Sequence, residues 1–198
     1  MKQALAGEPK NALYWYYLGR IQYSQNAFAE ARGALLTALS LSPGNTRDLY
    51  NLGLTYEGLG DTVKAIALYE QAIASEPAGA PQDAQPYYDL GWLLSRQKNP
   101  AEALPLLEKA AILDPRNPGI RERLAKVEEQ AGHLDRSRND LEFAVSLEPN
   151  VSSLHFELGH VYQKLHMMAE AKEQFAICST IAGTHSTAGS DSLDFAKP

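Results

Sequence analysis

Prolines recur at a nearly constant interval along this chain of 198 residues, and this spacing constrains the fold more than any other feature of the sequence. With gaps of 34, 34, 38 and 34 residues, the prolines are Pro9, Pro43, Pro77, Pro115 and Pro149. An alanine stands five residues before each of them, at Ala4, Ala38, Ala72, Ala110 and Ala144. A fixed period of about 20–50 residues is typical of chains that stack one small structural unit many times.

A second set of small residues indicates that each unit contains two helices. The first column is a Leu-Gly or Leu-Ala pair: Leu18-Gly19, Leu52-Gly53, Leu90-Gly91, Leu124-Ala125 and Leu158-Gly159. Twelve residues after its Gly or Ala comes another small residue: Ala31, Ala65, Ala103, Ser137 and Ala171. Small side chains let two helices approach closely, and the apolar residues around them follow the spacing of three and four that an amphipathic helix requires. We therefore expect the two helices of a unit to cross at these small residues.

The combined pattern resembles the tetratricopeptide repeat family. The first unit matches the family pattern at Trp15, Leu18, Gly19, Ala31, Leu35, Ala38 and Pro43. The fourth unit departs from it, because Arg121 and Glu128 stand where apolar side chains are usual. The resemblance implies an all-α fold, a right-handed α-solenoid of antiparallel helix pairs.

The columns also predict the boundaries of the units. We expect five repeats at residues 12–45, 46–79, 84–117, 118–151 and 152–182, with a four-residue insertion at 80–83. In the same register, residues 1–11 would be the C-terminal part of a truncated preceding repeat helix, whose exposed apolar edge around Leu5 predicts self-association. Gly183 stands in the proline column, and the polar segment after it has no helical period. Residues 183–198 are therefore expected to form a disordered tail or a linker.

Composition argues against several classes of function. The net charge of −6 argues against a nucleic-acid-binding protein, because such proteins usually carry a basic face. No apolar run approaches the roughly 18 residues that a membrane span needs. The N-terminal residues lack the apolar stretch of a secretory signal, which weakly favours a cytoplasmic location.

The sequence contains no motif that predicts catalysis or a cofactor. It has no phosphate-binding glycine loop, no Gly-x-Ser-x-Gly elbow and no His-Glu-x-x-His motif. His155, His160 and His166 are spaced by five and six residues, which does not place them on one helical face as metal ligands. Cys178 stands in the alanine column, which indicates a packed small side chain. We expect no enzyme activity, no metal and no cofactor.

The resemblance implies instead a binding surface. In the family, the first helices of the repeats line a concave groove that holds extended or helical peptides. Carried over to this sequence, the groove residues are Tyr16, Arg20, Tyr23, Arg47, Tyr50, Leu54, Tyr88, Trp92, Arg96, Lys126, Phe156 and His160. An alternative is that Tyr16, Tyr50, Tyr88 and Phe156 pack between neighbouring first helices.

One branch of the family clamps the terminal carboxylate of chaperone tails with Lys, Asn and Arg. Only Asn51 matches here, because Tyr16, Arg20, Gln85 and Asp89 replace the other clamp residues. We therefore expect a non-catalytic protein–protein interaction scaffold that binds a peptide or partner protein other than a chaperone tail. The alternative is the repeat arm of a larger enzyme, of glycosyltransferase or kinase type, with its catalytic part outside this chain.

Overall fold

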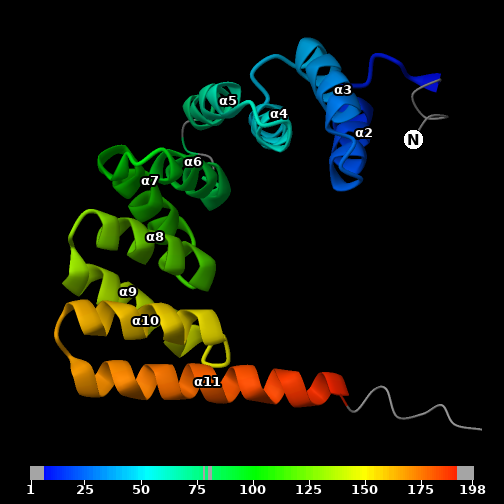
Figure 1. Ribbon diagram of the computed structural model, residues 1–198. Helices are drawn as coiled ribbons and strands as arrows, with labels where there is room; N and C mark the ends of the chain where they lie inside the picture. Colours follow the sequence, from blue (N-terminus) through cyan, green and yellow to red (C-terminus); the bar gives the residue numbers. More distant parts are fainter. Residues whose placement is uncertain (1–6, 78, 80–81, 191–198) are drawn as a thin grey trace, which may run out of the picture. The chain divides into compact units, whose positions relative to one another are not determined.

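The computed structural model describes residues 7–77, 79 and 82–190 (Figure 1). All regular secondary structure in these residues is α-helical, from α2 to α11. The chain divides into two compact units, Met1–Lys98 and Asn99–Pro198. The expectation of an all-α helical repeat fold is confirmed. Residues 1–6, on which the predicted adhesive edge depends, lie outside the described residues.

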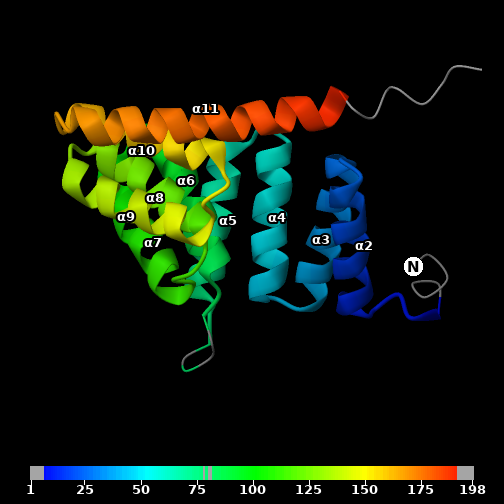
Figure 2. The same cartoon turned by 90° about the horizontal axis from the view of Figure 1, so that it is seen from below.

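In its described residues from α2 onward, the first unit contains two helix hairpins and one further helix. These are α2 (Ala12–Ser24), α3 (Phe28–Leu41), α4 (Thr46–Gly58), α5 (Thr62–Ala74) and α6 (Ala84–Arg96). Each helix packs against the next one in the chain, and α2 also contacts α4. Figures 1 and 2 show α2 beside α3, and α4 between α3 and α5. The first helices of successive repeats therefore meet within this unit.

The second unit continues the pattern. It consists of α7 (Pro100–Leu113), α8 (Pro118–Gln130), α9 (Leu134–Leu147), α10 (Ser152–Lys164) and α11 (Met168–Ser190). Again each helix packs against its successor. An apolar cluster of this unit draws on α8, α9, α10 and α11 and includes Leu141, Leu154 and Leu158.

The small-residue columns stand where the paired helices cross, as the sequence predicts. A Cβ atom placed on Gly19 would lie 2.6 Å from Cγ of Leu35 and 3.3 Å from the carbonyl oxygen of Ala31. A Cβ on Gly53 would lie 2.6 Å from the ring of Tyr69, and one on Gly159 would lie 2.6 Å from the ring of Phe175. The large side chain of each second helix occupies the space that the glycine leaves.

The first helices begin at polar capping residues in repeat register. The side chains of Asn11, Asn45, Asp83 and Asn117 accept hydrogen bonds from backbone N–H groups of the first turns of α2, α4, α6 and α8. Such a cap satisfies donors that a helix start otherwise leaves unpaired. In the fifth repeat Val151 holds this position without a side-chain cap.

The turns inside the repeats share one backbone conformation. A residue with φ between 58° and 82° occurs in each of them: Asn26, Gly60, Lys98, Gly132 and His166. This left-handed conformation favours glycine, because a side chain there meets the following carbonyl oxygen. Lys98 and His166 therefore adopt it at an energetic cost.

The last helix is longer than the sequence indicates. The structure differs from the expected end at residue 182, because α11 continues through Gly183 to Ser190. Gly183 has no positive φ, and no proline follows it before Pro198, so nothing there stops the helix. Figures 1 and 2 show the C-terminal part of α11 extending past α10. Residues 191–198 of the expected tail lie outside the described residues.

The charged residues that set the fourth repeat apart have oppositely charged neighbours on α9. Arg121 on α8 pairs with Asp140 on α9 at 2.7 Å. Glu128 is 0 % exposed, and Nε of Arg136 lies 2.9 Å from its Oε1. Burial, and secondarily Asp140, raises the pKa of Glu128 well above its usual range. The two residues that break the family pattern thus have partners on α9.

Candidate functional site

Six of the predicted groove residues meet at one hollow in the first unit. This hollow, the arginine pocket, has a volume of about 440 Å³. Its lining comes from α2, α4 and the segment before α6: Tyr16, Arg20, Tyr23, Ser24, Arg47, Tyr50, Asn51, Leu54 and Asp83. The spacing of three and four within each helix directs these side chains to one side, and the contact of α2 with α4 joins the two rows.

Two guanidinium groups supply positive charge to the arginine pocket. Arg20 and Arg47 are exposed, and neither forms an ion pair with a described residue. The guanidinium carbon of Arg20 lies 5.7 Å from the centre of the Tyr16 ring. An unpaired arginine beside aromatic rings is suited to a carboxylate, because its fork of N–H donors matches two carboxylate oxygens.

A hydrogen-bond network lies under the arginine pocket. The hydroxyl of Tyr50 donates to Oδ2 of Asp89 at 2.6 Å, and Gln85 Nε2 donates to the same oxygen at 3.2 Å. Burial, and then Asp89, raises the pKa of Tyr50, while burial raises the pKa of Asp89. Tyr50 therefore connects α4 with α6, as the packing alternative expects, and also lines the pocket.

The residues at the clamp positions have partners of their own. Asn51 Nδ2 donates to the carbonyl oxygen of Arg47 at 2.8 Å, one helical turn away. Gln85 and Asp89, which replace the clamp Lys and Arg, bond to each other. The carboxylate clamp is not formed by these side chains.

The remaining predicted residues lie elsewhere. Tyr88 and Trp92 are partly buried on α6, where Arg96 is exposed. In the second unit Lys126 pairs with Glu122 at 2.9 Å and with Glu157 at 2.5 Å. His160 lies edge-on to Phe156, with ring centres 4.5 Å apart, and both lie near Phe175.

Lys126 and His160 line a smaller hollow. Its volume is about 180 Å³, and its other lining residues are Glu129, Leu141, Glu157 and Lys164. Lys164 pairs with Glu129 at 2.6 Å. Because the two lysines of this hollow are paired with carboxylates, it offers less unpaired charge than the arginine pocket does.

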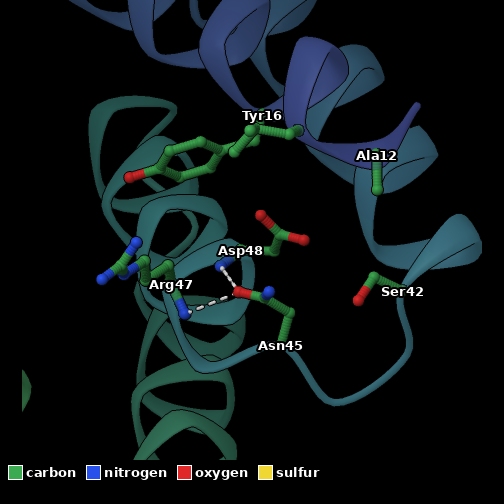
Figure 3. A pocket seen from close by; sticks show the side chains of 7 residues that line it. Ala12, Tyr16, Ser42, Asn45, Arg47 and Asp48 are labelled. Atoms are coloured by element: carbon green, nitrogen blue, oxygen red, sulfur yellow. Dashed lines mark hydrogen bonds between the residues drawn. The ribbon is translucent and has the colours of Figure 1, made fainter.

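The first unit has a second pocket that the sequence does not predict. This Asp48 pocket has a volume of about 210 Å³ and is lined by Ala12, Leu13, Tyr16, Ser42, Asn45, Arg47 and Asp48. Figure 3 shows the Asp48 carboxylate directed toward α2, whereas the Arg47 guanidinium points away from that carboxylate. Burial raises the pKa of Asp48 to about 6. A comparison of repeat columns could have found it, since Ile120 and Leu154 hold the same position in later repeats.

The described ranges hold neither a candidate metal cluster nor a candidate membrane span. No group of three His, Cys, Asp or Glu side chains in them is placed to share a metal ion. None of the helices between residues 7 and 190 is both long and apolar enough to cross a bilayer.

Helix pairs in register, crossing at small residues, place this chain among the all-α helical repeat solenoids. The chain belongs to the tetratricopeptide repeat family, whose models match residues 1–46, 49–111 and 94–142. This fold is typical of protein–protein interaction, and proteins of the family are typically non-catalytic.

Solved structures share the fold. YrrB, described as a TPR protein with an unusual peptide-binding site, has a TM-score of 0.79 at 19% identity, with 96% of each chain covered. MamA 41-end from Desulfovibrio magneticus RS-1 has a TM-score of 0.79 at 20% identity, covering 87% of this chain and 96% of that one.

A curated relative is the TPR repeat-containing thioredoxin TTL4 of Arabidopsis thaliana, 27% identical over 104 residues. The match covers 52% of this chain and 15% of the relative, so this chain corresponds to a small part of that protein.

Proposed function

We propose that the first unit binds an extended peptide segment of a partner protein, along α2, α4 and α6, and that the chain acts as a non-catalytic scaffold. The observation that carries the proposal is the arginine pocket, where two unpaired guanidinium groups and three tyrosines line a hollow of about 440 Å³. Membership of the repeat family and the peptide-binding site named for YrrB support it.

The pocket also predicts the chemistry of the ligand. Tyr16, Tyr23, Tyr50 and Leu54 offer an apolar wall for an aliphatic or aromatic anchor. Arg20 and Arg47 favour an acidic residue next to that anchor. Affinity for one peptide is expected to be about micromolar, or roughly 8 kcal/mol, because an extended segment loses conformational freedom when it binds.

Selection from a displayed library of random dodecapeptides on the immobilised full chain tests the proposal. Enriched peptides should combine an apolar anchor with an acidic residue. Their affinity, measured by fluorescence anisotropy, should fall by about tenfold or more in Arg47→Glu, and the loss should shrink at high salt.

The matched control is Arg116→Glu, the same charge reversal at an exposed position of the second unit. It should leave the affinity unchanged. Peptides that bind Arg47→Glu as tightly as the wild type would place the ligand outside the arginine pocket. A library that yields no enriched peptide would contradict peptide binding itself.

A second candidate function is that of a repeat arm in a larger enzyme, which was expected as a glycosyltransferase or kinase. The curated relative favours this class of architecture, because its name joins TPR repeats to a thioredoxin. The full open reading frame tests it: a catalytic domain next to these repeats would support the arm, and a reading frame without one would contradict it.

A further inference from the structure

Asp48 places a carboxylate in a column that is apolar in later repeats. The equivalent residues are Pro86, Ile120 and Leu154, all of which are buried. Ile120 and Leu154 are 2 % and 1 % exposed, and Asp48 is 3 % exposed. The substitution therefore exchanges a packed hydrocarbon side chain for a shorter and charged one. The Asp48 pocket lies where that bulk is missing.

The carboxylate of Asp48 has no partner among the described residues. Its backbone N–H donates to Oδ1 of Asn45, but the carboxylate itself accepts no hydrogen bond from a described residue and forms no ion pair with one. In Figure 3 it projects into the pocket toward α2, with Tyr16 and Ala12 ahead of it and Ser42 to one side. An ionised carboxylate without a partner is unfavourable at a buried position, and a cation that enters the pocket can supply that partner.

Helix capping does not account for Asp48. Asn45 already caps α4 by accepting from the backbone N–H groups of Arg47 and Asp48, at 3.1 and 3.2 Å. The later first helices α8 and α10 begin with Ile120 and Leu154 at this position. A carboxylate in the first turn gains from the helix dipole, yet burial outweighs that gain here, since it raises the pKa of the group.

We propose that the Asp48 pocket binds the basic side chain, lysine or arginine, of the peptide held in the neighbouring arginine pocket. This inference rests on the proposed function. A volume of about 210 Å³ is below the roughly 300–1,000 Å³ of a whole small-molecule site and suits a single side chain. Ala12, Leu13 and Tyr16 form apolar walls for the aliphatic stem, and Asp48 and Ser42 offer oxygen acceptors for the cation.

The two pockets share Tyr16 and Arg47, so one peptide can occupy both. Alternate residues of an extended chain lie about 7 Å apart on the same side. The ligand is therefore a segment with an acidic and a basic residue a few positions apart, the acidic residue beside Arg20 and Arg47 and the basic one beside Asp48.

Small probes test the pocket without any peptide. NMR spectra of the full chain are recorded with millimolar N-acetyl-lysine methylamide, N-acetyl-arginine methylamide, N-acetyl-norleucine methylamide or potassium chloride. The basic probes should give saturable shifts of the Asp48 carboxyl carbon and of the Ser42 and Asn45 amides. The basic probe that binds more tightly identifies lysine or arginine as the side chain that occupies the pocket. Equal shifts with norleucine or potassium chloride, or no shift with either basic probe, would overturn the inference.

Library selection on variants tests the connection to the peptide. Peptides selected on the wild type should contain a basic residue at fixed spacing from the acidic one. Asp48→Asn and Asp48→Leu should bind them at least about 30-fold more weakly and should select peptides that keep the acidic residue and lose the basic one. Basic residues retained by both variants would overturn the inference while leaving peptide binding intact. If the selection fails but the basic probes bind, the result would contradict peptide binding and would still support a site for a basic group at Asp48.

Discussion

The hydroxyl of Tyr50 on α4 donates a 2.6 Å hydrogen bond to Oδ2 of Asp89 on α6, and this bond ties together two first helices beneath the arginine pocket. The two residues lie 39 positions apart in the chain. A residue expected to bind a ligand thus has its polar atom engaged inside the protein. Its ring alone is left for the pocket.

Tyr50→Phe should therefore lower stability more than ligand affinity. The substitution keeps the ring and leaves the partly buried Asp89 with Gln85 as its remaining donor. We expect a loss of about 1–2 kcal/mol in the free energy of unfolding, measured by urea denaturation. Affinity for a selected peptide should change less than about threefold, since the phenol is not offered to it. An unchanged unfolding curve with a large loss of affinity would show that the hydroxyl serves the ligand instead.

Gly53→Ala should destabilise the first unit because its new methyl group would meet the ring of Tyr69. Two ring carbons lie 2.6 and 2.7 Å from the Cβ position, and Tyr69 is 0 % exposed. We expect a loss of about 1–3 kcal/mol, as in other overpacked cores. Gly33→Ala, on the open side of α3 with no atom within 4 Å, is the matched control. It should raise stability by about 0.5–1 kcal/mol, and equal effects of the two would refute the close crossing.

His166→Gly should stabilise the hairpin of α10 and α11. The residue has φ of 61°, and glycine adopts this conformation without the strain that a side chain brings. Allowing for the greater freedom of glycine in the unfolded chain, the gain should be about 0.5–1 kcal/mol in thermal or urea unfolding. Gly132→Ala at the equivalent turn position should have the opposite sign. A shared sign would mean that backbone conformation does not govern these turns.

Asp48→Leu should make the ligand-free chain more stable. The raised pKa of Asp48 means that its ionised form, which predominates at neutral pH, is unfavourable in the folded state. Leucine restores the apolar column, and we expect a gain of about 1–2 kcal/mol at pH 7. The isosteric Asp48→Asn separates the loss of charge from the gain of packing. Destabilisation by both variants would indicate a structural role in the start of α4.

Glu128→Gln should reduce the fall in stability as pH rises. Because the folded pKa of Glu128 is raised, the folded chain holds a proton that the unfolded chain releases from about pH 5 upward. Stability from this group is therefore present at low pH and is lost as pH rises toward the folded pKa. The glutamine of the variant does not ionise, so its stability does not fall with this titration. The free energy of unfolding, measured with urea, should match that of the wild type at pH 5 and exceed it by about 1–2 kcal/mol at pH 9. Parallel pH profiles would contradict this.

The repeat columns predicted the helix pairs because small and large residues alternate at the crossings. Gly19 with Leu35, and Gly53 with Tyr69, need only the helical period and the repeat length to be placed together. The end of α11 could not be placed in this way. A glycine such as Gly183 ends a helix only when its backbone turns left-handed, and sequence does not distinguish that case from a glycine within a helix.

The candidate site was less predictable because it depends on which polar atoms already have partners. The residue types of Arg47, Tyr50 and Asn51 suggest three binding side chains. The structure engages the polar groups of Tyr50 and Asn51 in hydrogen bonds, whereas Arg47 forms no ion pair with any residue that the structure describes. The repeat pattern does not mark Asp48, because its column has no common residue and holds Tyr14, Pro86, Ile120 and Leu154 in the other repeats.

The left-handed residues of the hairpin turns bear on how such a chain can change its length. Asn26 and Gly60 adopt the same backbone conformation 34 residues apart, so excising or duplicating the segment between them joins two equivalent backbones. The gene can therefore gain or lose a helix pair by unequal recombination without inventing a new turn. Growth of this kind adds recognition surface in discrete steps and leaves every existing repeat in register.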